Sequence, residues 1–203
     1  APLWALTGAW GVMKWRGSQL NIDGDPARTK VIPTYHPVQI QWAYDLRAIM
    51  VNDLRRAAKE SLTKSYTNIP EWRFILRPNL QMVIDTLTPL LARMDSGEEL
   101  WIDFDLETRA GHISCAGLSW SRLDAICIPL MDKASWDGYW ELVEDEAVVV
   151  YLIYRVLTHP NVKVRGQNLL YDTQYTYRHW HFVPRVKQDT MISHHTMWAG
   201  LPK

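Results

Sequence analysis

The stretch Leu100-Trp-Ile-Asp-Phe-Asp-Leu-Glu-Thr108 is the part of this sequence that decides its fold. It predicts a buried strand that carries two carboxylates, Asp105 and Glu107. Residues two positions apart on a strand point to the same face, so both carboxylates converge on one spot beside an apolar sheet. Clustered like charges are costly unless cations neutralise them, and carboxylate oxygens suit hard ions such as Mg²⁺ or Mn²⁺. The stretch therefore predicts a metal site for phosphodiester chemistry.

Periodic segments on both sides of this strand predict an α/β layer structure. Turn signals, Arg109-Ala-Gly111 among them, separate three neighbouring strands as in a meander. The expected strands cover 72–76, 99–107, 112–120, 124–130 and 162–165, and the expected helices cover 79–94, 145–157, 168–180 and 191–198.

The first part of the chain is expected to form a unit of its own. Residues 30–37 predict a strand that runs into a loop, and residues 42–61 predict an amphipathic helix. The polar stretch 63–71 contains a proline and predicts a linker. The expected organisation is thus one unit over 1–62, a linker, and a second domain over 72–203.

Length and composition bound the class of protein. The 203 residues suffice for one large domain, or for one domain and part of another, and 47% hydrophobic residues provide a real core. The formal net charge is zero, which excludes a basic nucleic-acid coat protein, so any contact with nucleic acid has to come from local patches and bound metal. The 11 tryptophans predict core and groove packing, with some available for stacking on bases.

The state expected for the two cysteines is consistent with a reducing compartment. Cys115 and Cys127 lie in strand-like apolar runs and are expected to be buried free thiols. The sequence contains no signal peptide and no apolar run near the roughly 20 residues that a membrane helix needs. The chain begins at Ala1 without an initiator methionine and stops at Lys203 just after a helical pattern, which predicts a piece of a longer polypeptide. The expected location is the cytoplasm, with no membrane partner.

Two later segments extend the acidic pattern. They are Gly166-Gln-Asn-Leu-Leu-Tyr-Asp172 and Gln188-Asp-Thr-Met191. With them the chain resembles the DEDD-type 3′–5′ exonucleases, because Asp105-Leu-Glu107 is similar to their first motif, Asp-x-Glu, and the first later segment is similar to their second, Asn-x-x-x-Asp. The order, the spacing and the Asp-Thr-Met segment resemble the proofreading domain of family A DNA polymerases over residues 72–203.

The resemblance implies an RNase H-like exonuclease domain with a mixed central sheet flanked by helices. Asp105, Glu107 and Asp172 would then be catalytic and hold two divalent cations, Mg²⁺ or Mn²⁺, for hydrolysis at the 3′ end of single-stranded DNA. Asn168 lies one helical turn before Asp172 and is expected to share its face, where it orients the acid or contacts nucleic acid. Thr108 is expected to contact the 3′-terminal nucleotide.

The third motif of that family, Tyr-x-x-x-Asp or His-x-x-x-Asp, does not follow Asp172. His181 is followed four residues later by Arg185, and in the polymerase branch the position of the motif falls beyond Lys203. The resemblance therefore implies an exonuclease domain truncated before its third motif. It also implies a downstream polymerase domain of the same polypeptide as a partner.

Other polar residues near the motifs have weaker claims to a role. Asp103 shares the face of Asp105 by parity, either as a residue that supports the site or as a solvated acid at the strand end. Asp189 is a candidate ligand by position, although the matching residue of the resembled family does not bind metal. The histidine pairs lack a Cys or an acid at zinc-site spacing and are expected at the surface; they are His179 with His181 and His194 with His195.

The beginning of the chain carries a second resemblance. The segment Lys30-Val-Ile-Pro-Thr-Tyr-His-Pro37, with Arg16-Gly17 before it and Asp53-Leu54 after it, is similar to the C-terminal part of uracil-DNA glycosylases of the bacterial, iron–sulfur-bearing branch. By that match His36 contacts a flipped base, and the following proline shapes the loop. Val38 stands where that family has Ser or Ala. The alternative is a loop histidine beside a proline turn.

Together the two resemblances imply a piece of a phage-like or bacterial family A DNA polymerase that works in a bacterium or in a phage-infected host cell. Two alternatives keep the same fold. One is a catalytically inactive module that binds single-stranded nucleic acid, and the other is an RNA-trimming exonuclease of the same superfamily. If the chain has no exonuclease chemistry, the expected protein is a nucleotide-binding α/β domain with an acidic rim.

Overall fold

A computed structural model describes residues 2–64, 70–132, 134 and 137–197. The chain divides into two compact units, one holding Ala1–Ile69 and the other holding Pro70–Gly200. The expected linker over 63–71 falls at this division, and most of it, residues 65–69, lies outside the described residues.

The first unit contains short helices and one two-stranded antiparallel ladder. Its elements are α1 (Pro2–Thr7), α2 (Val12–Trp15), β1 (Leu20–Asn21), β2 (Lys30–Val31), α3 (Gln39–Trp42) and α4 (Leu46–Glu60). The strand expected over 30–37 is therefore only two residues long, and the helix expected over 42–61 begins later, after a separate turn of helix.

Asp53 on α4 ties the first unit together. Its carboxylate is buried and accepts hydrogen bonds from Arg16 Nη1 at 2.9 and 3.0 Å and from Thr34 Oγ1 at 2.8 Å. A buried carboxylate is tolerated only when it is paired and hydrogen-bonded in this way. The pair therefore links α4 to the segments that precede β1 and follow β2.

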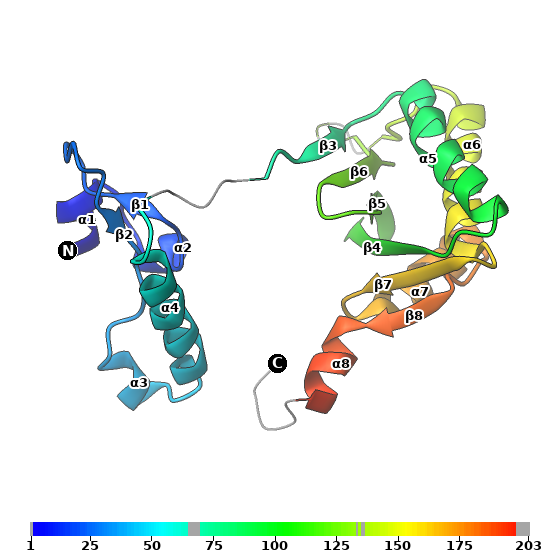
Figure 1. Ribbon diagram of the computed structural model, residues 1–203. Helices are drawn as coiled ribbons and strands as arrows, with labels where there is room; N and C mark the ends of the chain where they lie inside the picture. The colour runs from blue at the N-terminus through cyan, green and yellow to red at the C-terminus, as the bar shows by residue number, and fades with distance from the viewer. Residues whose placement is uncertain (1, 65–69, 133, 135–136, 198–203) are drawn as a thin grey trace. The chain divides into compact units, whose positions relative to one another are not determined.

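The second unit is built on a six-stranded mixed sheet, whose strands run β3, β6, β5, β4, β7, β8 across it (Figure 1). Strand β5 is antiparallel to β4 and β6, whereas the other neighbouring pairs are parallel. The elements are β3 (Arg73–Leu76), α5 (Leu80–Asp95), β4 (Leu100–Arg109), β5 (His112–Ser119), β6 (Asp124–Pro129), α6 (Val143–Thr158), β7 (Val162–Gly166), α7 (Leu169–Trp180), β8 (Val186–Asp189) and α8 (Thr190–Met197). The expected mixed central sheet flanked by helices is confirmed.

Strand β8 was not among the expected strands. Its four residues, Val-Lys-Gln-Asp, are mostly polar, and two of them are exposed. A strand of this composition lacks the apolar run or alternation by which strands are recognised. Its pairing with β7 supplies the hydrogen bonds that hold it in the sheet.

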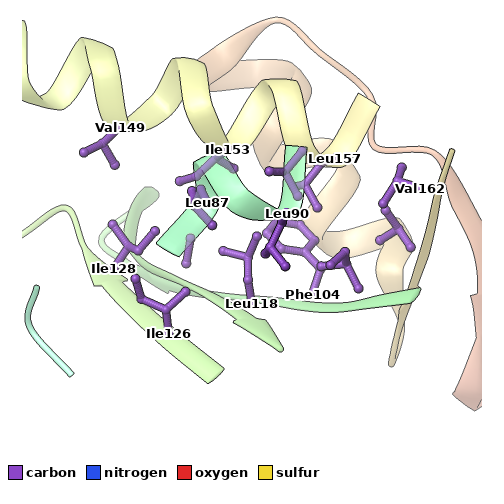
Figure 2. Packing of buried hydrophobic residues seen from close by; sticks show 14 of the residues in the cluster. Leu87, Leu90, Phe104, Leu118, Ile126, Ile128, Val149, Ile153, Leu157 and Val162 are labelled. Carbon is purple, nitrogen blue, oxygen red and sulfur yellow. The ribbon is translucent and has the colours of Figure 1, made fainter. Parts of the chain in front are cut away.

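One hydrophobic core covers one face of the sheet. Figure 2 shows Leu87 and Leu90 of α5 and Ile153 and Leu157 of α6 packed over Phe104 of β4. Helices α5 and α6 lie side by side along this face (Figure 1). Each such side chain stabilises the fold by about 1.5–3 kcal/mol when it leaves water. The core therefore holds β4, the strand with the acidic residues, in a fixed place.

The helices of the described residues are short. The longest, α5 and α6, have 16 residues each. Among the residues that the structure describes, no helix combines the length and the apolar character needed to cross a bilayer.

The two cysteines are less buried than expected. Cys115 and Cys127 are free thiols, and both are half-buried. Cys115 lies opposite Glu107 in the register of β4 and β5, so it occupies the sheet face that turns away from the core. Burial, and then the neighbouring Cys127, raise the pKa of the Cys115 thiol to about 12. The prediction of full burial was wrong because apolar neighbours in sequence do not reveal which side of the sheet a residue takes.

Candidate functional site

Strand β4 separates its acidic residues from the core. Ile102 and Phe104 are buried, whereas Asp105 and Glu107 are exposed and Asp103 is half-exposed. This alternation follows from the two-residue period of a strand. All three acids therefore stand on the sheet face opposite α5 and α6.

Asp172, in the first turn of α7, joins this strand from 66 residues further along the chain. Its side chain is buried, and Oδ1 accepts a hydrogen bond from the backbone N–H of Leu106 at 2.7 Å. The pKa of Asp172 is raised to about 6. Burial is the largest cause; the hydrogen bond from Leu106 acts to lower the pKa, and the negative charge of Asp105 acts to raise it. The buried acid of the second motif is thus held beside the strand that carries the first, while a shared catalytic site of Asp105 and Asp172 stays a prediction.

Glu107 lies at an irregular point of the strand. The register with β5 shifts between Glu107 and Thr108, which marks a β-bulge. In the described part of the chain, no three side chains of His, Cys, Asp or Glu are arranged so that they could hold a metal ion. Coordination of a cation by Asp105, Glu107 and Asp172 therefore stays a prediction.

Asn168 does not lie where a regular helix would place it. It precedes the first residue of α7 and has left-handed backbone angles, with φ 56° and ψ 41°. Its side chain is exposed and makes no capping hydrogen bond to the helix. The expectation that Asn168 shares a helical face with Asp172 was wrong, because the helix begins one residue later.

Asp189 is the residue that caps this helix. Its carboxylate accepts the backbone N–H groups of Asn168, Leu169, Met191 and Ile192 at 3.1, 2.8, 2.9 and 3.2 Å. Burial acts to raise the pKa of Asp189, but the four backbone donors outweigh it and lower the pKa. Asp189 thus anchors the starts of both α7 and α8, a role that the sequence did not reveal.

We expect Asp189→Ala to lower the free energy of unfolding by about 1–3 kcal/mol, because four backbone N–H groups at the starts of α7 and α8 lose their acceptor. Urea unfolding followed by circular dichroism measures this. Lys187→Ala, an exposed change on the same strand, is the control and should stay within about 0.5 kcal/mol of the parent protein. Equal stabilities of the two variants would contradict the anchoring role.

Gly166 allows β7 to approach β4 just before α7 begins. A Cβ at this position would lie 2.5 Å from the carbonyl oxygen of Phe104 and 2.6 Å from Cδ2 of Leu169. Both distances are shorter than side chains tolerate, and one neighbour is backbone. The glycine therefore sets the separation between β4 and the start of the helix that carries Asp172.

We expect Gly166→Ala to destabilise the protein by about 1–3 kcal/mol, as overpacking of a tight site does. Gly117→Ala is the matched control in the same sheet, because its Cβ would meet the nearest atom, the oxygen of Asp105, at an ordinary 3.7 Å. Thermal unfolding of both variants checks the difference. A Gly166→Ala variant as stable as Gly117→Ala would show that the two strands separate freely.

Thr108 contacts α7 through its side chain. Its Oγ1 lies 2.6 Å from the hydroxyl of Tyr171, so one of the two groups donates a hydrogen bond to the other. This bond connects the end of β4 to the residue next to Asp172. Contact of Thr108 with a nucleotide stays a prediction.

A hollow of about 550 Å³ lies on the sheet face that carries the acids. Asp103 and Asp105 form one side of it, and the exposed side chains of Phe74 and Leu76 on β3 form another. Asp103 is held in place by Arg165, whose Nε and Nη2 donate to it at 2.5 and 2.8 Å. Sequence analysis missed Phe74 and Leu76, because nothing in the sequence indicates that β3 joins the sheet beside β6.

His36 belongs to the first unit. It is exposed, its Nδ1 accepts the backbone N–H of Val38 at 3.2 Å, and its own N–H donates to Gln39 Oε1 at 3.2 Å. These bonds shape the loop after β2. Contact of His36 with nucleic acid stays a prediction.

Comparison with known proteins finds similarity only among solved structures. No family model matches the sequence, and neither does any curated protein. Escherichia coli RNase D, an exoribonuclease involved in structured RNA processing, matches with TM-score 0.35 and 12% identity over 59% of this chain and 27% of that one. Trypanosoma brucei RNase D matches with TM-score 0.42 and 11% identity over 57% and 37%.

A third similar structure is Brucella melitensis NrnC with bound Mg²⁺. It matches with TM-score 0.41 and 13% identity, over 66% of this chain and 57% of that one. The chain thus spans less than two thirds of the length of each of these proteins.

Proposed function

We propose that this chain is a metal-dependent 3′–5′ exonuclease that hydrolyses phosphodiester bonds at the 3′ ends of single-stranded DNA. The observation that carries the proposal is the meeting of Asp105 and Asp172. These acids come from two sequence motifs that resemble the first and second exonuclease motifs. Asp172 is hydrogen-bonded to Leu106, the neighbour of Asp105 on β4, and the charge of Asp105 acts on it. A chance pair of acids would not be expected to combine both features.

The residues present suit divalent cations. Asp105 and Asp172 are close enough for the charge of one to disfavour ionisation of the other, and a cation between them would remove that cost. We propose that these two acids and Glu107 hold two Mg²⁺ or Mn²⁺ ions. When bound, such ions activate water for attack on phosphorus and neutralise developing negative charge.

The surrounding residues have positioning roles in this proposal. The N–H of Leu106 holds the carboxylate of Asp172 against β4, so that it stays in place when the substrate arrives. The hollow beside Asp105 receives the 3′-terminal nucleoside, with Phe74 and Leu76 as its apolar wall. Thr108 near the end of β4 and Asn168 just before α7 contact the nucleotide in this proposal.

The finer parts of the proposal rest on the sequence motifs. The Asp-Thr-Met segment and the order of the motifs favour the proofreading part of a phage-like or bacterial family A DNA polymerase, with a downstream polymerase domain as its partner and the cytoplasm as its location. We further propose that the first unit is the C-terminal part of a glycosylase-like domain in which His36 contacts nucleic acid.

Digestion of a 5′-labelled single-stranded DNA in Mn²⁺ tests the function. We expect a ladder of products shortened from the 3′ end, and no digestion in EDTA. The same oligonucleotide made of RNA is the matched substrate. Faster digestion of the RNA would favour an RNA-trimming enzyme, and absence of both digestion and Mn²⁺ binding would favour an inactive binding module.

A further inference from the structure

A row of aromatic rings continues from the acidic site along α7. It consists of Tyr171, Tyr175 and His179 on the helix and His112 at the start of β5, and is called the ring ladder below. Successive ring centroids are 4.9, 5.8 and 5.6 Å apart. The helical members are spaced four residues apart, which places them on one face of the helix.

The ring ladder begins at the proposed catalytic centre. Tyr171 directly precedes Asp172, and its hydroxyl bonds to Thr108. At the other end, Nε2 of His179 donates a hydrogen bond to the carbonyl oxygen of Gly111 at 3.0 Å. Eight helical residues cover on the order of 12 Å, which is the length of about three stacked nucleotides. The ladder therefore leads away from the acids over a short stretch of a nucleic-acid strand.

The far end of the ring ladder opens into a second hollow, of about 320 Å³. His112 and His179 line it together with Trp180 and Glu146. Burial raises the pKa of the Glu146 carboxyl, which makes this group a hydrogen-bond donor over a wider pH range. Flat rings beside hydrogen-bonding groups are the features with which proteins hold an unstacked base.

Positive charge accompanies the rings in a chain whose formal net charge is zero. Arg178 lies close enough to Tyr175 for its positive charge to act on the tyrosine hydroxyl. Arg109 is the last residue of β4, just before the turn at Gly111. Cations beside exposed rings suit a single strand, whose phosphates meet the cations while its bases stack on the rings. Tyr171 is 41% exposed, so its outer face is available for such stacking.

We propose that the ring ladder and the hollow at its end bind the nucleotides on the 5′ side of the 3′-terminal residue of a single-stranded nucleic acid. This inference rests on the proposed exonuclease function and assigns the upstream part of its substrate site. The rings are too close together to admit a base between them, so the bases lie on their outer faces. The ladder thus adds affinity for longer strands without touching the scissile bond.

Substrate length separates this role from the chemistry. Tyr175→Leu and His112→Leu remove rings that do not touch the acids, and Tyr177→Leu is the control, because Tyr177 is 62% exposed on the other side of α7. Hydrolysis of a dinucleotide and of a 12-mer in Mn²⁺ is measured for each variant, with the affinity for the 12-mer from fluorescence anisotropy in EDTA. We expect roughly tenfold weaker binding and a higher KM for the 12-mer in the ladder variants, with dinucleotide hydrolysis unchanged.

A variant at an exposed residue tests the proposal even if the ladder variants fail to fold. Arg178→Glu changes an exposed residue beside the ladder, and it should weaken binding of the 12-mer and flatten its salt dependence. Parental affinity for the 12-mer in folded ladder variants, or an equal loss on both substrates, would overturn the proposal, and so would a parent protein that binds no 12-mer. A parent that binds the 12-mer through the ladder but hydrolyses nothing would support the ladder and refute the exonuclease.

Discussion

Replacing Asp105 with alanine is expected to reduce Mn²⁺-dependent digestion of single-stranded DNA by roughly 10³-fold, since a bound metal supplies several kcal/mol of transition-state stabilisation. Asp105 is exposed on the sheet face opposite the core, so the fold should remain intact. The same change should abolish the rise in melting temperature that Mn²⁺ causes in the parent protein, because an ion stabilises only the form that binds it. Digestion rates and thermal unfolding with and without Mn²⁺ measure both effects.

Asp85→Ala provides the matched control for this experiment. Asp85 is exposed on α5, where it accepts a hydrogen bond from Gln81 at 2.8 Å, and it is not near the acids of β4 in sequence. Its removal should leave digestion and the response to Mn²⁺ unchanged. Undiminished digestion by Asp105→Ala would contradict the assignment of the acidic site.

Asp172→Asn is expected to abolish digestion and yet to stabilise the folded protein at pH 8. The folded-state pKa of Asp172 is raised to about 6, by burial first and also by the charge of Asp105, against an ordinary value near 4. The folded protein therefore keeps a proton between pH 4 and 6 that the unfolded chain releases. The stabilising effect of this proton is fully present below pH 4 and is lost as the pH rises through 6.

Asparagine carries no charge at any of these pH values, and its Oδ1 can still accept the N–H of Leu106. The variant should therefore gain up to about 3 kcal/mol of unfolding free energy at pH 8, and this gain should fade toward pH 4. Urea unfolding in EDTA at pH 4.5 and pH 8 measures the difference. If the variant's unfolding free energy rose equally at both pH values, or fell at pH 8, the ionised Asp172 carboxylate would not be the main source of destabilisation.

A stabilising change that removes activity would also identify the reason for the buried acid. A protein that keeps a carboxylate where its charge is disfavoured has a destabilised site, and such sites are typical of function. The two substitutions are complementary, because Asp105→Ala removes the exposed member of the pair and Asp172→Asn neutralises the buried one. Asp105→Ala should also lower the pKa of Asp172 by removing a nearby negative charge.

Sequence patterns predicted those parts of the site that depend on local geometry. The two-residue period of β4 places Asp105 and Glu107 on one face and Phe104 on the other, whatever packs against the strand. The order and spacing of the motifs suggested a shared site of Asp105 and Asp172 through resemblance to a family, and the structure holds Asp172 against Leu106, the neighbour of Asp105. The helices α5 and α6 likewise follow from the apolar pattern within single segments, and Asn79 caps the start of α5.

Other features depended on contacts between segments and were missed. Strand β8 is polar and exists because β7 offers it an edge, and Asp189 caps two helices only once β8 has placed it between their starts. Asn168 takes left-handed angles at the entry to α7. Cys115 lies on the outer face of the sheet because its strand pairs opposite Glu107.

By itself, then, the sequence determined a mixed α/β domain whose central strand carries acids on one face, because alternation along a strand requires no partner. Only the tertiary structure decided which acid lies next to which, how deeply Asp172 is buried, and that a ladder of rings on α7 begins at that acid. The physical reason is that burial, pKa shifts and ring contacts arise between segments up to about 70 residues apart, and each depends on how the sheet orders those segments.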